Sequence, residues 1–250
     1  LLVIAVLASL GVALWQANVA RQSATLARDE AMRANAVRDF LVSVFRGAQP
    51  GVPSDRRPGI EQRVDAATQQ ALADTAMGEA VRTDLLIALA AVGQSLGTYE
   101  RALDLLDKAT VGVDRLYAQS DPQWFRPRLV RATTLISMAR YADTVDLLEP
   151  LRPQLAARGD VIGVEGMLLL ADGLNGSNRF DEAQSLYDQA RDAAKKLSPS
   201  TAVNVDTIDI SQARSLIYAQ RFKDGLALAD ATWQRWEERG NKADPQMLTL

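Results

Sequence analysis

The 250-residue sequence contains neither cysteine nor histidine. Without cysteine the chain can form no disulfide, no thiol nucleophile and no thiolate metal site. Without histidine it lacks the commonest general base and the commonest metal ligand. Runs of alternating polar and apolar residues, which would indicate β-strands, are also missing. No catalytic residue, cofactor-binding residue or metal ligand is therefore expected, and the fold should be helical.

Neither sign of charge dominates the chain. It carries 28 lysines and arginines against 31 acidic residues, for a net charge of −3. A nucleic-acid-binding protein needs a concentrated basic face, so no nucleic-acid partner is expected. Hydrophobic residues make up 48% of the chain, which is enough for a sizeable core.

The first 15 residues, LLVIAVLASLGVALW, carry no charge. A membrane-spanning helix needs about 20 apolar residues. Residues 1–15 therefore predict the end of a transmembrane helix, with Trp15 at the interface. A signal peptide, whose cleavage pattern is poorly matched in this segment, and a buried helix are the alternatives. Because the chain starts without methionine and ends soon after a predicted helix start, we expect a piece of a longer protein.

A second pattern occupies residues 16–46. Alanines recur with gaps of three and four residues, and neither glycine nor proline interrupts the segment before residue 46. Heptad positions of this kind form the seam of a coiled coil, so the segment predicts a juxtamembrane helix that pairs with a second copy of itself. The alternative is a single amphipathic helix lying on the following domain. The predicted seam consists of Ala17, Ala20, Ala24, Ala27, Ala31 and Ala34.

Residues 47–59 hold three glycines and three prolines and predict a linker, and residues 60–250 contain a repeat. Four stretches share a turn, an aromatic residue, a small residue three positions later and an amphipathic helix pattern. Another helical stretch precedes each, with alanine nine residues before the aromatic. Since neither helix can bury its apolar face alone, stacked helix pairs are expected. The aromatics are Tyr99, Tyr141, Phe180 and Phe222, the small residues Ala102, Thr144, Ala183 and Gly225, and the alanines Ala90, Ala132, Ala171 and Ala213.

The chain is therefore predicted to be all-α, a long helix followed by a solenoid of about four helix pairs. Residues 60–75 would form a lead-in cap, residues 245–250 would open a fifth repeat, and the aromatics would anchor each second helix. The predicted helices cover residues 1–46, 60–75, 80–95, 99–116, 124–138, 142–157, 161–176, 180–197, 203–219 and 222–238.

The repeat, glycine–x–aromatic–x–x–alanine after a small residue, resembles the tetratricopeptide (TPR) family. The first and third copies match well. The second and fourth have Ala139 and Gln220 in place of the glycine, and Thr144 and Gly225 in place of the alanine. Four copies in series at a near-constant period make the resemblance specific.

The order of apolar run, alanine helix, linker and repeats resembles the C-terminal half of bacterial membrane-anchored serine/threonine protein kinases. The resemblance implies a single inner-membrane span, repeats in the periplasm, and ATP and Mg²⁺ only in a kinase domain that this sequence does not include. The alternatives are the repeat region of a membrane-bound winged-helix transcriptional regulator and an intracellular TPR scaffold.

The TPR resemblance also implies a groove lined by the first helix of each pair. Its position implies a sensor or scaffold region that binds a protein or peptide, with a groove that has no partner as the alternative. Arg126, Asn175, Arg214 and Tyr218 could donate hydrogen bonds to a peptide backbone or carboxylate, while Asp172 would oppose an acidic ligand. The full set is Asp84, Ile87, Gln94, Arg126, Leu129, Thr133, Glu165, Leu168, Asp172, Asn175, Thr207, Arg214 and Tyr218.

Overall fold

The computed structural model describes residues 16, 21, 24, 28, 30–43, 59–197 and 203–239. Within these ranges the only regular secondary structure is helical, which confirms the predicted all-α class. The chain divides into two compact units, residues 1–89 and 90–250, which are described separately.

In the first unit residues 30–43 are helical, followed by α2 (Ile60–Ala73) and the greater part of α3 (Glu79–Ser95). The turn between α2 and α3 is held by one side chain. The Arg82 guanidinium donates to the carbonyl oxygens of Ala71 at 3.2 Å and Asp74 at 2.6 Å. These bonds satisfy carbonyl groups that the end of α2 leaves without a helical partner.

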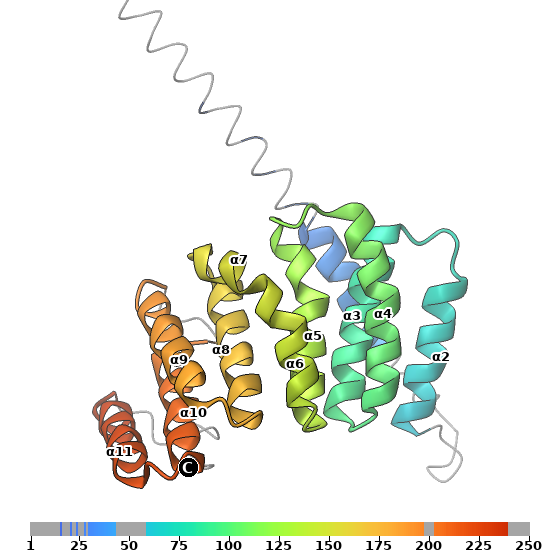
Figure 1. Ribbon diagram of the computed structural model, residues 1–250. Coiled ribbons are helices and arrows are strands. Elements are labelled where there is room, and N and C mark those ends of the chain that lie inside the picture. Colours follow the sequence, from blue (N-terminus) through green and yellow to red (C-terminus); the bar gives the residue numbers. More distant parts are fainter. Residues whose placement is uncertain are drawn as a thin grey trace, which may run out of the picture. The chain divides into compact units, whose positions relative to one another are not determined.

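The second unit is a series of helix pairs that stack on one another in chain order, as Figure 1 shows for α5 to α11. The first and second helices of a pair are joined by three-residue turns. The helices are α4 (Tyr99–Leu116), α5 (Pro122–Ser137), α6 (Tyr141–Leu148), α7 (Arg152–Ala157), α8 (Val161–Gly176), α9 (Phe180–Ala194), α10 (Val205–Tyr218) and α11 (Phe222–Glu238).

One predicted helix is wrong. Residues 142–157 were expected to form a single helix, but α6 ends at Leu148, a 3₁₀ turn covers Glu149–Leu151, and α7 completes the segment. Pro150 and Pro153 explain the break, because proline has no N–H to donate and its ring clashes with the preceding turn. The other predicted boundaries in residues 60–238 agree with the structure to within three residues.

The turn inside each helix pair has the same backbone geometry in all four repeats. The residue two positions before the aromatic has a positive φ, +77° at Gly97, +56° at Ala139, +62° at Asn178 and +61° at Gln220. The next residue donates its N–H to the carbonyl five positions back, as Arg140 does to Leu135 at 2.9 Å. This is a Schellman C-cap. Ala139 and Gln220 therefore adopt the geometry that the repeat assigns to glycine, despite the cost of a left-handed L-residue.

The small residues of the repeat are buried in both helices of each pair. All four predicted alanines of the first helices, from Ala90 to Ala213, are buried, and so are the four small residues of the second helices. At the fourth crossing, a Cβ on Gly225 would come within 2.9 Å of the Ala213 carbonyl oxygen. The predicted close approach is confirmed there.

The aromatic residues are placed correctly but are less buried than predicted. Each is the first residue of its second helix. Tyr99, Tyr141 and Phe180 are only half-buried, and Phe222 is 57% exposed. An aromatic at a helix start packs on one side against the first helix, so its other side depends on what the next repeat supplies.

The predicted localisation, one inner-membrane span with periplasmic repeats, is contradicted. In the part of the chain that the structure describes, no helix is both long enough and apolar enough to cross a membrane. The apolar run 1–15, on which the prediction rested, lies outside the described residues, as do positions 47–58 of the linker and the predicted fifth repeat at 245–250.

Candidate functional site

A cavity of about 520 Å³ opens in the second unit where the C-terminal ends of the first helices meet the turns of the repeats. It receives side chains from α5, α8 and α10 and from the first residues of α6 and α9. The lining residues are Ile136, Tyr141, Asp172, Asn175, Gly176, Asn178, Phe180, Arg214 and Tyr218.

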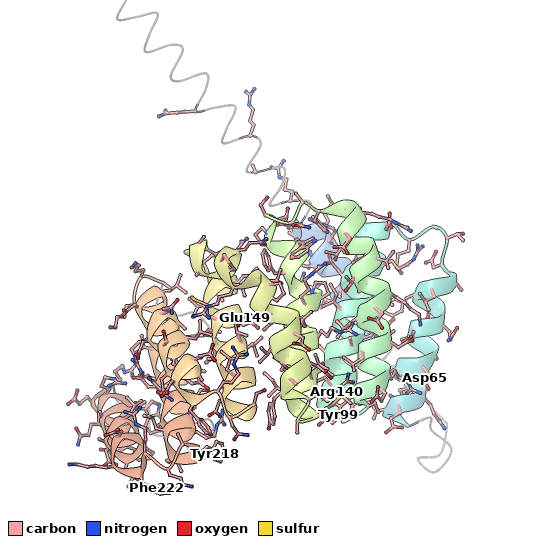
Figure 2. All side chains as sticks on the ribbon, in the orientation of Figure 1. Asp65, Tyr99, Arg140, Glu149, Tyr218 and Phe222 are labelled. Carbon is pink, nitrogen blue, oxygen red and sulfur yellow. The ribbon has the colours of Figure 1, made fainter. Side chains whose placement is uncertain are left out.

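Four of the five principal groove candidates, Asp172, Asn175, Arg214 and Tyr218, line this one cavity. They come from α8 and α10, which are the first helices of two successive repeats. Tyr218 is 63% exposed at the end of α10, and Figure 2 shows it near the start of α11, where Phe222 stands. Its ring is therefore available to a ligand.

The remaining groove candidates are placed differently. Arg126 is exposed near the start of α5, where it donates to the Gln123 side chain at 3.0 Å, and it does not line the cavity. Three apolar candidates are core residues, because Ile87, Leu129 and Leu168 are buried. The first-helix register therefore led to polar candidates that line the cavity and to apolar candidates that belong to the core. The other five, Asp84, Gln94, Thr133, Glu165 and Thr207, are half-buried and do not line this cavity.

Asp172 gives the cavity a carboxylate in an unusual environment. Burial raises the pKa of this carboxyl above its ordinary value of 3.8, although the Tyr187 hydroxyl and the Arg214 charge act in the opposite direction. Tyr187 is fully buried and donates to Asp172 Oδ1 at 2.6 Å. Burial, together with the Asp172 charge, also raises the pKa of Tyr187, so the phenol remains a hydrogen-bond donor at neutral pH.

Asn175 is the lining residue whose orientation is best defined. Its Oδ1 accepts a hydrogen bond of 2.7 Å from the Ser215 hydroxyl of α10. Ser215 in turn accepts from the Gln184 amide of α9 at 2.9 Å, and Gln184 accepts from Gln212 of α10 at 2.9 Å. The amide of Asn175 thus ends a chain of hydrogen bonds that connects three helices.

The far end of this chain is charged. The Arg191 guanidinium of α9 donates to Gln212 Oε1 and to the carboxylate of Asp209. Asp209 is buried and also pairs with Arg235 of α11, which is part-exposed. An ion pair that is buried on one side needs such additional partners to offset desolvation. The contact between the third and fourth repeats is therefore polar.

The sequence did not identify Tyr141, Phe180 or the chain behind Asn175 as parts of the site. The two aromatics were assigned to packing alone, but their exposed sides line the cavity. The sequence does contain one indication of this hydrogen-bond chain. Gln184 stands four residues after the aromatic, where the other three repeats have Leu103, Val145 and Leu226.

The alanine seam is only partly within the described residues. Ala24, Ala31 and Ala34 are exposed, and Ala17, Ala20 and Ala27 lie outside. Further along the same segment, Ala36 and Phe40 line an apolar cavity of about 300 Å³ together with residues of α3 and the turn before it, including Met77, Val81 and Leu85. This placement favours the alternative in which residues 36–40 lie on their own chain, while pairing through the alanines stays a prediction.

No protein-family model matches the chain, and no curated protein matches it. Solved structures do. Two crystal structures of nearly identical TPR-like repeats from a Podosopora anserina protein assigned as a kinesin light chain superpose on it. One, of a point variant, has a TM-score of 0.57 at 17% identity over 67% of this chain and 81% of that chain. The other has a TM-score of 0.56 at 16% identity over 73% and 91%.

A third match is BtubC (BKLC) from P. vanneervenii, with a TM-score of 0.53, 13% identity and 74% of both chains covered. At such identities the likeness concerns the fold alone. The chain therefore has a TPR-like repeat fold, an architecture whose stacked helices form extended binding surfaces for proteins. Such repeats typically hold no cofactor, and among the described residues no group of three or more acidic, histidine or cysteine side chains could hold a metal ion.

Proposed function

We propose that this chain is a non-catalytic binding region that holds a peptide segment of a partner protein in the cavity between α5, α8 and α10. The observation that carries the proposal is the convergence of Asp172, Asn175, Arg214 and Tyr218, from two repeats, on one open cavity with aromatic walls. Ligand sites commonly combine apolar walls with a few polar groups that fix orientation.

The chemistry of the lining suits a peptide. Tyr141, Phe180 and Tyr218 offer ring surfaces for side chains, while Asn175 and Arg214 offer donors for main-chain carbonyl groups. Asp172 disfavours a strongly acidic segment, because a second negative charge would meet a carboxylate that is already desolvated.

A selection experiment tests this proposal. A display library of random peptides is panned against the 250-residue chain, and the affinities of the recovered peptides are measured by fluorescence anisotropy. Arg214→Ala should weaken binding about ten-fold or more, the usual effect of removing a charge-assisted hydrogen bond. Arg126→Ala is the matched control, since this arginine is also exposed at its surface but lies outside the cavity.

Two results would contradict the proposal. One is that panning recovers no peptide that competes for a single site. The other is an equal loss of affinity in the two arginine variants, because binding would then occur elsewhere on the repeats.

The output that such binding controls is a second part of the proposal, and it rests on sequence resemblance alone. Residues 16–45 and the repeats after them resemble the C-terminal half of one group of kinases, the bacterial membrane-anchored serine/threonine protein kinases. We propose that the chain regulates a kinase domain of this kind through its bound partner. The coding sequence upstream of Leu1 decides the matter: kinase motifs there support the proposal, and a winged-helix domain would indicate a transcriptional regulator instead.

A further inference from the structure

The hydrogen-bond chain behind the cavity has a direction. In a carboxamide the oxygen accepts and the nitrogen donates, and the partners determine which atom points to which side. Arginine can only donate, and an ionised aspartate can only accept. Groups of these two kinds therefore determine the orientation of any amide that lies between them.

Gln212 lies between such groups. Its Oε1 accepts from the Arg191 guanidinium, and its Nε2 donates to the Asp188 carboxylate at 3.1 Å. The same Nε2 also donates to Gln184 Oε1 at 2.9 Å. With Arg191 and Asp188 on opposite ends of the amide, Gln212 has one orientation that satisfies every partner, and Gln184 has to offer its oxygen.

The orientation of Gln184 then determines the orientation of each following group up to the cavity. Because the Gln184 oxygen is occupied, its nitrogen points toward Ser215 and donates at 2.9 Å. Ser215 accepts that bond, and its hydroxyl donates to Asn175 Oδ1 at 2.7 Å. The oxygen of Asn175 is thereby occupied, and its Nδ2 finds no acceptor among the described residues.

We infer that Asn175 presents its two N–H donors to the cavity and selects a ligand with a hydrogen-bond acceptor, such as a main-chain carbonyl, and that Arg191 sets this orientation through Gln212, Gln184 and Ser215. The four residues behind Asn175 are positioning residues that need not touch the ligand. The part that concerns a ligand rests on the proposed function of the cavity, and the part that concerns orientation does not.

A single-atom change should reverse the direction. In Gln184→Glu the side chain has two acceptor oxygens, one for Gln212 and one for the Ser215 hydroxyl. Ser215 then has a free lone pair and no proton for Asn175, so the Asn175 amide turns and donates to Ser215. Its oxygen now faces the cavity, and a donor site becomes an acceptor site.

Nuclear magnetic resonance of the full chain, with ¹⁵N in the asparagine side chains, follows this change without any ligand. The Asn175 signal is identified by its loss in Asn175→Asp. In the wild type its amide protons should exchange freely with water, and in Gln184→Glu the bonded proton should exchange about ten-fold more slowly. Gln189→Glu is the matched control, because it adds the same charge to the same helix at an exposed glutamine whose amide donates to Ser185 and takes no part in the chain behind Asn175.

Binding gives the second measurement. A peptide selected on the chain should lose affinity about ten-fold or more in Gln184→Glu and in Asn175→Asp, because an acceptor then faces an acceptor, and should keep its affinity in Gln189→Glu. Slow exchange in the wild type, or no effect of Gln184→Glu on exchange, overturns the inferred direction. A changed exchange rate with unchanged affinity overturns the inferred recognition. If no peptide is selected, the proposed function fails, while the exchange rates still decide the orientation.

Discussion

The Tyr141 ring lies directly on the backbone of Gly176, so that a Cβ on this glycine would come within 2.2 Å of the ring. The contact joins the second helix of one repeat to the first helix of the next, at the edge of the cavity. Only glycine at position 176 leaves room for the Tyr141 ring, which forms one wall of the cavity.

Gly176→Ala should destabilise the chain by about 1–3 kcal/mol, the usual cost of overpacking. The sign of the stability change is informative, because alanine in a helix is otherwise more favourable than glycine by about 0.5–1 kcal/mol. Urea unfolding followed by circular dichroism measures the change. Gly159→Ala, at a position with open space around it, serves as the control. A stabilised Gly176→Ala variant would show that Tyr141 moves aside freely.

Ala139→Gly should stabilise the chain by about 0.5–1 kcal/mol. The left-handed backbone at this turn is costly for alanine and free of strain for glycine, which offsets the greater entropy of glycine in the unfolded chain. The reverse change, Gly97→Ala, should destabilise by a similar amount. Thermal melts of both variants test the prediction. If both changes moved the midpoint the same way, the left-handed geometry would be wrong for one of the two turns.

Leucines at equivalent positions of two repeats should differ strongly in their contribution to stability. Leu103 is 7% exposed and Leu226 is 58% exposed, although each stands four residues after its aromatic. Leu103→Ala should cost about 2–5 kcal/mol as a core truncation. Leu226→Ala should change the free energy of unfolding by less than about 0.5 kcal/mol, as at most surface positions. Denaturant unfolding of both variants measures the difference, and equal costs would mean that a segment outside the described residues, or a second molecule, covers Leu226.

Asp172→Asn should change how stability depends on pH. The folded-state pKa of Asp172 is raised, so between 3.8 and that higher value the folded chain holds more protons than the unfolded chain. Stability contributed by this group is therefore lost as the pH rises through that window, and the loss persists at neutral pH. The asparagine variant lacks this ionisable group, so its stability relative to the wild type should increase as the pH rises from about 4. Denaturant midpoints across this window and up to neutral pH test this, and parallel curves for the two proteins would refute it.

The sequence predicts the repeat well because the repeat is local. The aromatics, the small residues and the alanines of each helix pair lie close together in the sequence; each aromatic begins its helix, and the small residues and alanines are buried. The break at Pro150 was also visible in the sequence, but the helical periodicity around it was given more weight than the missing donor.

The features that the sequence could not predict depend on contacts between repeats. The exposure of Phe222 depends on whether another helix packs beside α11, and the cavity depends on how Tyr141 meets Gly176 across two helices. The hydrogen bond between Ser215 and Asn175 joins residues 40 positions apart. No pattern within one repeat indicates such a bond, although a glutamine at an otherwise apolar position marks the helix face where it lies.

The polar contact between the third and fourth repeats also affects the stiffness of the array. Apolar surfaces can shift across one another at little cost because the hydrophobic effect has no direction, whereas a hydrogen bond weakens steeply once its angle changes. The joint at Gln184, Arg191 and Asp209 should therefore resist bending and twisting more than the joint between α6 and α8, where Val145 packs against Gly173. Force applied to a partner held in the cavity would pass to α11 across a rigid connection, while the α6–α8 joint would bend more easily.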